Sequence, residues 1–295
     1  MKNFLKPSLL LIALSLFNFV SAQEDLLNSL DKEVSDTIIY TAYTFKSTHI
    51  INGHSVENMR TKQLDFRINH RFGQLNTGAY ELFGLDHALI NFSLDYGITD
   101  WLMLGVRRGT EDKTYDGSAK FILFRQCSGK KNFPVSISYF SDMSIVTLKY
   151  ANRNVTNINR LAFTHQLLIA RKFNEKLSLQ LTPTFVHRNQ VNFDNVNNVE
   201  AIGFGGRYKF IRRVALTWEY FYSPQVAADK THSFNPVALG FDIETGGHVF
   251  QLFVSNSQQM VENGVIANTQ GDFRHGGLFL GFNISRAFAF GSARE

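Results

Sequence analysis

The chain has one cysteine, Cys127, and only five prolines in 295 residues. A single cysteine cannot form an internal disulfide bond, so the fold is not a disulfide scaffold. Basic and acidic residues are interspersed, and no run of Lys and Arg resembles a nucleic-acid-binding surface. We therefore expect no nucleic-acid partner.

Long hydrophobic runs are also scarce. The one nearly continuous apolar stretch, residues 9–20, follows Lys2 and Lys6 and precedes Ser21-Ala22. At about 12 residues it is too short for a transmembrane helix, which needs about 20. The pattern is typical of a signal peptide, residues 1–22, cleaved before Gln23, with a membrane anchor as the alternative. Its removal takes away two lysines, so the formal net charge falls from +5 to +3.

Beyond residue 22 no run of 18 apolar residues remains, which argues against a helical membrane protein. The chain is instead rich in aromatic residues, with 28 Phe and 10 Tyr beside 21 Gly. This composition favours strands over helices. No linker-like stretch interrupts the chain, so we expect one domain.

Apolar and polar residues alternate along many segments, as in Leu64-Asp65-Phe66-Arg67-Ile68-Asn69 and Val237-Ala238-Leu239-Gly240-Phe241-Asp242. Alternate residues of a strand face opposite sides, so each segment has one apolar and one mostly polar face. The strand phase stays open at residues 119–125 and 161–171. The expected strands are residues 63–72, 87–96, 101–109, 117–126, 134–141, 159–171, 177–188, 199–210, 214–223, 235–244, 248–256 and 275–288.

Short and long connections between these strands take turns along the chain. The short connections are residues 97–100, 127–133, 172–176, 211–213 and 245–247. The alternation is weakest at residues 110–116, because this connection stands where a long one is expected but is no longer than the short connection 127–133. Transmembrane barrels have short periplasmic turns and longer outside loops. We therefore predict an all-β fold, a transmembrane antiparallel up-and-down β-barrel of about 12 strands over residues 62–295. A soluble β-sandwich is the alternative.

Residues 23–61 precede this barrel and lack its regular alternation. We expect them to form an N-terminal segment that stays in the periplasm, lies along the barrel wall or enters the barrel lumen. The predicted location of the protein is the cell outer membrane of a Gram-negative bacterium, reached by export. Its expected partners are outer-membrane lipids and, during biogenesis, the barrel-assembly machinery.

A family resemblance is carried by several short motifs. They are Leu64-Asp65-Phe66-Arg67-Ile68-Asn69-His70-Arg71-Phe72-Gly73, Tyr96-Gly97-Ile98-Thr99-Asp100, His248-Val249-Phe250-Gln251-Leu252 and Gly281-Phe282-Asn283-Ile284-Ser285-Arg286. With them the chain resembles an uncharacterised family of outer-membrane β-barrel proteins, known as a domain of unknown function. The resemblance implies a barrel in the outer membrane and no particular activity.

The chain offers few motifs for chemistry. None of its nine histidines forms an H-x-x-x-H pair, and His49 and His54, five residues apart, are weak grounds for a metal site. The glycines of residues 203–206 lie in an expected strand with no helix after them, so a nucleotide-binding loop is not indicated. We expect no catalytic residue, cofactor or metal ligand, and hence no enzyme.

The polar faces of the strands are the remaining candidate site. A Lys or Arg facing lipid at mid-membrane costs about 2–4 kcal/mol, so these side chains are expected to face the lumen. The candidates are Asp65, Arg67, Arg71, Asn91, Asp95, Arg107, Lys120, Arg188, Arg207, Glu219, Asp242, Glu244, Gln251 and Asn283.

Three functions fit this pattern. The first is a passive, porin-like channel for small polar solutes. The second is a closed structural or interaction barrel that binds a partner through its loops or its N-terminal segment. The third is an outer-membrane lipid hydrolase, which needs a serine beside a histidine on the lipid face, where His165 and His187 lie on adjacent expected strands.

Overall fold

The computed structural model describes residues 37–149, 155–191, 196–228 and 233–290. Strands dominate these residues, and the helices are short. No helix in the described ranges is long and apolar enough to cross a bilayer. The chain divides into two compact units.

The smaller unit comprises the described residues 37–41 together with 126–134. In it β1 (Ile38–Tyr40) pairs antiparallel with β6 (Cys127–Gly129), with Ile38 opposite Gly129. Cys127 is buried and not bonded to another cysteine.

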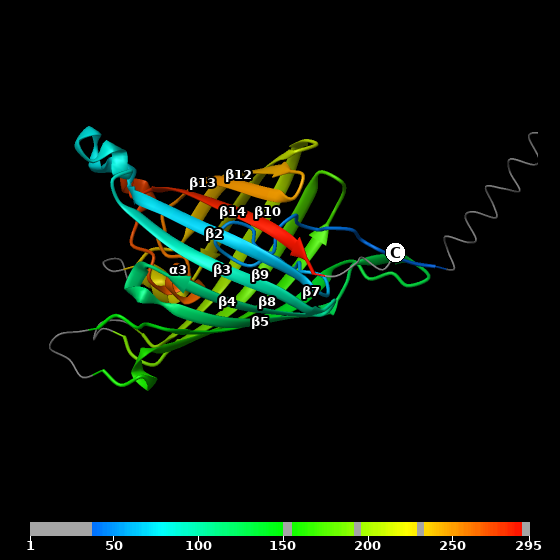
Figure 1. Cartoon of the computed structure of the whole chain (residues 1–295), viewed down its shortest axis with the longest axis horizontal. Coiled ribbons are helices and arrows are strands. Elements are labelled where there is room, and N and C mark those ends of the chain that lie inside the picture. Colours follow the sequence, from blue (N-terminus) through cyan, green and yellow to red (C-terminus); the bar gives the residue numbers. More distant parts are fainter. Residues whose placement is uncertain (1–36, 150–154, 192–195, 229–232, 291–295) are drawn as a thin grey trace, which may run out of the picture. The chain divides into compact units, whose positions relative to one another are not determined.

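The larger unit is a closed antiparallel barrel of 12 strands, as predicted (Figure 1). Neighbours in the chain are neighbours in the sheet, and β14 pairs with β2 to close the ring, so no edge strand remains. Its strands are β2 (Gln63–Gln74), β3 (Ala88–Thr99), β4 (Leu102–Gly109), β5 (Tyr115–Phe124), β7 (Ser136–Ile145), β8 (Leu161–Lys172), β9 (Leu177–Arg188), β10 (Asn198–Ile211), β11 (Val214–Tyr222), β12 (Val237–Thr245), β13 (His248–Ser255) and β14 (Phe279–Ala289).

The alternation of the sequence becomes an inner and an outer face. In β2, Asp65 and Arg67 point inward and are buried, whereas Phe66 between them lies on the outer face. The open phase in β5 has a local cause, because the pairing with β7 shifts register between Ile122 and Phe124. A β-bulge of this kind interrupts strict alternation. In β8, the even positions from residue 162 to 170 are the buried ones.

The connections define two ends of the barrel. The turns at residues 100–101, 173–176, 212–213 and 246–247 lie at what we call the short-turn end, and the longer connections form the long-loop end. One expected short turn departs from the pattern. The connection from β5 to β7 spans residues 125–135, longer than residues 110–114 between β4 and β5, because it carries β6.

Two segments fold into the barrel. Residues 44–58, here called the lumenal hairpin, enter from the short-turn end, where Lys172 Nζ donates to Ala42 O at 3.2 Å. The lumenal loop, residues 256–272 between β13 and β14, carries α3 (Glu262–Ala267) and lies at the long-loop end. Figure 1 shows α3 at one end of the barrel and the light-blue segment that leads into β2 at the other.

Candidate functional site

The lumenal hairpin is a tight turn whose own hydrogen bonds are few. Ile50 N donates to Gly53 O at 2.9 Å, and Ser55 N donates to Thr48 O at 2.9 Å. One isolated bridge joins His49 and His54. Most other backbone groups of the hairpin must find partners on the barrel wall, because buried peptide groups are costly when unpaired.

Glu219 of β11 holds the tip of the hairpin. Its carboxylate accepts the backbone N–H groups of Ile51, Asn52 and Gly53 at 3.3, 2.9 and 3.1 Å. Hydrogen bonds to an ionised acceptor are stronger than those between neutral groups. This one side chain therefore fixes three consecutive residues of the turn.

Glutamines on two other strands hold the flanks. Gln180 of β9 accepts from Val56 N at 2.9 Å and donates to His54 O at 2.8 Å. Gln251 of β13 donates to Ile50 O at 2.6 Å. An amide side chain both donates and accepts, so it pairs with the hairpin backbone as a neighbouring strand would.

Cations of the wall bind the remaining oxygens. Lys120 donates to the carbonyl oxygens of Thr48 and Ser55 at 3.1 and 3.0 Å. Arg67 donates to Ser47 Oγ at 2.9 Å, and Arg71 donates to Asn52 Oδ1 at 2.8 Å. All three cations are almost completely buried.

An apolar patch on the inner wall receives the hairpin. Inward-facing apolar residues are unusual in a lumen lined by polar groups, and here they contact four apolar side chains of the hairpin. Each such side chain contributes about 1.5–3 kcal/mol when fully buried. The cluster consists of Phe45, Ile50, Ile51 and Val56 from the hairpin and Phe140, Leu168, Ala170, Ala238 and Phe253 from the wall.

Gly205 of β10 makes room for this contact. A Cβ atom at Gly205 would lie 2.6 Å from Ile50 Cδ1, closer than real Cβ atoms approach other heavy atoms. The glycine-rich residues 203–206 therefore serve close packing inside a strand, in agreement with the interpretation of these residues as strand rather than phosphate loop.

The lumenal loop is anchored through Arg107 of β4. Its guanidinium lies 2.6 Å from Asp116, 3.4 Å from Asp142 and 2.9 Å from Glu262, and all four side chains are buried. Asp116 and Asp142 belong to neighbouring strands, whereas Glu262 belongs to α3. The loop is thus held inside the barrel by a buried ion-pair network.

Apolar packing supports the same loop. Ile266 and Ala267 at the end of α3 join a cluster on the inner face of β9, β10 and β11. The other members of this cluster are Val186, Val199, Ala201, Phe221 and Val226.

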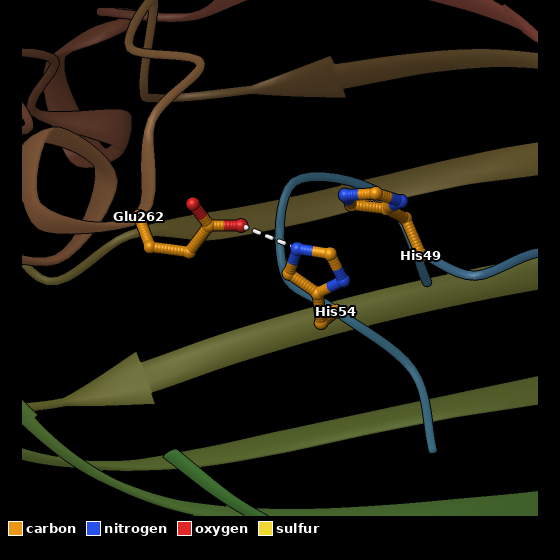
Figure 2. Close-up of side chains that lie close together, drawn as sticks. All are labelled: His49, His54 and Glu262. Atoms are coloured by element: carbon orange, nitrogen blue, oxygen red, sulfur yellow. Dashed lines mark ion pairs between the residues drawn. The ribbon is translucent and has the colours of Figure 1, made fainter. Parts of the chain in front are cut away.

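The hairpin and the loop meet in the middle of the lumen. His54 Nε2 lies 3.2 Å from Glu262 Oε1, and the His49 ring stacks on that of His54 with centroids 3.9 Å apart (Figure 2). Burial and Lys120 lower the pKa of His54 to about 4 against the effect of Glu262. Burial would raise the pKa of Glu262, but Arg107 and His54 hold it at about 2. At neutral pH, His54 is therefore neutral and Glu262 is ionised.

Thirteen of the fourteen candidate lumen residues are buried. The exception is Glu244 at the short-turn end, whose half-buried side chain pairs with Arg207. The candidates on β2, β4, β5, β11, β13 and β14 bind the hairpin or the loop, as described for Arg67, Lys120 and Glu219.

Sequence reasoning missed Asp116, Asp142 and Glu262. It placed Asp116 and Asp142 in connections, whereas β5 begins at Tyr115 and β7 continues to Ile145. Neither carboxylate stands in an alternating run long enough to reveal its strand. Glu262 lies in a connection, where no periodic signal indicates which way a side chain points.

The hairpin does not fill the whole lumen. A half-open cavity of about 540 Å³ at the short-turn end lies between the hairpin and the wall. Its charged lining includes Lys46, Glu57, Asp65, Arg213 and Glu244. A cavity of about 50 Å³ lies beside the lumenal loop at the other end.

The outer face holds one serine–histidine pair. Ser141 Oγ lies 3.2 Å from His165 Nδ1 across the β7–β8 pairing. Tyr139 Oη lies 2.8 Å from the same nitrogen. The pair is a geometric requirement of the hydrolase alternative, although the nitrogen that would act as base is shared with a tyrosine.

Solved structures with a similar fold are outer-membrane porins and channels. A NanC porin in a rhombohedral crystal form has 8% identity and a TM-score of 0.48, with coverage of 78% of this chain and 100% of that chain. A KdgM porin has 8% identity, a TM-score of 0.44 and coverage of 78% and 99%. The COG4313 outer membrane channel from Pseudomonas putida F1 has 12% identity, a TM-score of 0.47 and coverage of 79% and 98%.

No curated protein sequence matches the chain significantly. Residues 45–288, in contrast, match a family described as a membrane bound beta barrel domain, DUF5777. The match begins within the lumenal hairpin and ends in β14, so it includes the whole barrel. The predicted resemblance is confirmed, and the chain belongs to the DUF5777 family of membrane-bound β-barrel domains.

Proposed function

We propose that the protein is a porin-like channel of the outer membrane for small polar solutes, and that its own N-terminal hairpin closes it. The proposal rests on one observation: polar side chains of the barrel wall form hydrogen bonds with the backbone of the hairpin. Glu219, Gln180 and Lys120, from three different strands, all bond to the backbone of residues 48–56.

A permanently closed barrel does not need a separate segment inside it, because the side chains of the wall can fill the lumen. They do so in barrels of about eight strands, whereas barrels of sixteen to eighteen strands leave an aqueous channel. Here a segment that is separate from the wall supplies the filling. Withdrawal of the hairpin leaves a wall of Asp, Arg, Lys and Gln side chains that water can hydrate, which is the lining of a polar pore.

The other parts of the proposal follow from membrane insertion. Export through a signal peptide at residues 1–22 brings the chain to the outer membrane, with the barrel-assembly machinery and outer-membrane lipids as partners. The fourteen candidate residues line the solute path, and residues 23–61 contain the element that closes it. Passage of solutes needs no catalytic group, so the protein is proposed as a non-enzyme.

The test is conductance in planar lipid bilayers. In one variant residues 44–58 are deleted and a short Gly/Ser bridge joins their neighbours, which removes the backbone and the side chains of the hairpin but keeps the chain connected. We expect the intact protein to be mostly closed, and the variant to show stepwise current on the order of ten times larger or more. A Gly/Ser replacement of residues 76–85, an exposed connection between β2 and β3, is the matched control.

A closed interaction barrel is the second candidate, favoured by the apolar cluster under the hairpin. In that case neither the intact protein nor the hairpin variant conducts, although both insert into the bilayer. Co-purification of a partner that requires residues 23–61 would then favour the second candidate over the channel.

A further inference from the structure

The junction of the hairpin and the loop brings together three residues whose side chains commonly ligate metals. His49 and His54 come from the hairpin and Glu262 from α3, and one ligand atom of each lies within 4.8 Å of the other two. All three are buried, with exposed fractions of 5%, 1% and 2%. Figure 2 shows the Glu262 carboxylate pointing at His54, with His49 beside His54 on the side away from Glu262.

The spacing suits a small divalent ion. Ligand atoms about 2.0–2.1 Å from a tetrahedral zinc ion lie about 3.4 Å from each other. The separation of His54 Nε2 and Glu262 Oε1 is 3.2 Å. Coordination by these two atoms therefore requires little movement, whereas His49, whose ligand atom lies within 4.8 Å of the other two, must move closer to complete a set of three.

His54 Nε2 provides an independent indication. Although it lies close to Glu262, the atom makes no hydrogen bond of acceptable geometry, and it is fully buried. A buried nitrogen that faces a carboxylate without a well-formed hydrogen bond leaves a position that a cation can occupy. A metal ion between His54 and Glu262 would fill this position.

Charged groups of both signs surround the cluster. The described residues around it include three carboxylates, Asp116, Asp142 and Glu262, and three cations, Arg67, Arg107 and Lys120. Lys120 Nζ lies 3.3 Å from His54 Nδ1, on the far side of the ring from Glu262. Lys120 therefore does not occupy the ligand position.

We infer that His49, His54 and Glu262 bind a divalent transition-metal ion that joins the lumenal hairpin to the lumenal loop. Two imidazoles and one carboxylate form a set that suits zinc and its neighbours in the first transition series. Such a set leaves a fourth position for water or another ligand. The ion would hold together two segments that enter the barrel from opposite ends.

The proposal is tested on the full-length, tag-free barrel folded in detergent and freed of metal with a chelator. Titration with Zn²⁺ is followed by calorimetry, and Co²⁺ is used as a spectroscopic probe of coordination. We expect about one ion per chain, bound with a dissociation constant of about 1 μM or less, and the visible absorption of four-coordinate Co²⁺.

His49→Ala and His54→Ala each remove one ligand, and we expect each to weaken Zn²⁺ binding about 100-fold and to abolish the Co²⁺ absorption. His49→Ala is the safer variant, because among the described residues the His49 ring is hydrogen bonded to the Thr48 hydroxyl alone. His165→Ala is the matched control, since it removes a histidine from the outer face. Its Zn²⁺ affinity stays unchanged.

A second measurement covers the case in which a variant folds poorly. Zn²⁺ raises the unfolding temperature of the intact barrel if it binds the folded state alone. This rise is retained by His165→Ala and lost by His49→Ala. The proposal is overturned if Zn²⁺ does not bind the intact barrel, or if His49→Ala and His54→Ala bind it as tightly as the intact barrel does. Neither result depends on conductance, so the proposed channel function is tested separately.

Discussion

Replacement of Glu219 by alanine is the sharpest test of how the hairpin is held. The carboxylate of Glu219 accepts three backbone N–H groups at the hairpin tip, those of residues 51, 52 and 53. Its side chain is buried inside the barrel, on a strand that pairs with β10 and β12 along its whole length. The substitution therefore removes the anchor of the hairpin and leaves the barrel sheet intact.

The magnitude follows from the three lost hydrogen bonds. A buried donor left without its partner costs about 1–3 kcal/mol. Water can enter the space that the glutamate side chain vacates, so we use the lower limit, about 1 kcal/mol for each bond and about 3 kcal/mol in total. Because 1.4 kcal/mol corresponds to a factor of ten, the equilibrium between docked and released hairpin shifts about 100-fold toward release.

Hydrogen exchange measures this equilibrium directly. The amides of residues 51–53 exchange with solvent only when the hairpin leaves its site, so we expect their exchange to be about 100-fold faster in Glu219→Ala. Single-channel recording provides the functional counterpart, as a larger fraction of time in the open state. Amides of β11 and β12 keep their protection.

Two variants serve as controls. Glu219→Gln retains one acceptor oxygen and should give an intermediate effect. Glu200→Ala removes a carboxylate from the exposed face of β10 and should leave residues 51–53 protected. Unchanged exchange at residues 51–53 in Glu219→Ala, with a folded barrel, would refute the assignment of Glu219 as the anchor.

Four further predictions concern other parts of the molecule. Gly205→Val places side-chain atoms where Ile50 Cδ1 lies, so limited proteolysis should cut the hairpin faster while the barrel stays folded. Arg107→Ala leaves buried carboxylates without their cation and should lower the free energy of barrel unfolding in denaturant by about 3–5 kcal/mol. Burial, and then the charge of Asp112, raises the pKa of Glu111 to about 7, so the folded state favours the protonated acid. Burial of Glu111 beside the lumenal loop should therefore be most favourable below pH 4.5, the ordinary value, and become less favourable as the pH rises to about 7. Loop amides should exchange faster at the higher pH, even though the hydrogen bond from Gln259 favours the ionised form. Ser141→Ala should leave the release of fatty acid from a fluorogenic phospholipid at the level of the intact protein, because the Ser141–His165 pair is expected to be structural.

Control variants distinguish these specific effects from a general loss of folding. Gly117→Val is the control for position 205, since a Cβ at Gly117 meets nothing within 4 Å. Arg108→Ala removes the neighbouring, half-buried cation of the same strand and should cost little. Glu111→Gln should remove the pH dependence of loop exchange. A loss of phospholipid hydrolysis in Ser141→Ala would instead revive the hydrolase alternative.

The barrel was predictable because the membrane and the lumen impose opposite demands on alternate residues. In β2 this demand makes Leu64, Phe66 and Ile68 apolar and leaves Asp65 and Arg67 on the inner face. Closure of the ring and the number of strands follow from that pattern and from the turns. Where a bulge interrupts the alternation, near Ile122, the sequence left the phase open.

The sequence did not predict that the hairpin and the loop fill the lumen, because neither segment has the alternating pattern of the strands. The barrel wall binds the hairpin mainly through its backbone, and backbone contacts place few demands on residue type. Glu219 would accept the amides of almost any three residues in that conformation. The contact between His54 and Glu262 joins residues more than 200 positions apart, and neither lies in a periodic segment. Only the apolar pair Ile50-Ile51 among polar neighbours hinted that this segment packs against something.

The lumenal hairpin and the lumenal loop contact each other, so the stability of each segment inside the barrel depends on the other. The hairpin enters from the short-turn end and the loop from the long-loop end, and they touch where His54 meets Glu262. Glu262 also completes the charge network of Arg107, so moving either segment exposes part of the same buried network to water. Release of the hairpin should therefore loosen the loop, and release of the loop should loosen the hairpin, by the same coupling free energy. A solute or partner that binds the loop at one end of the barrel would in this way change the opening of the lumen at the other.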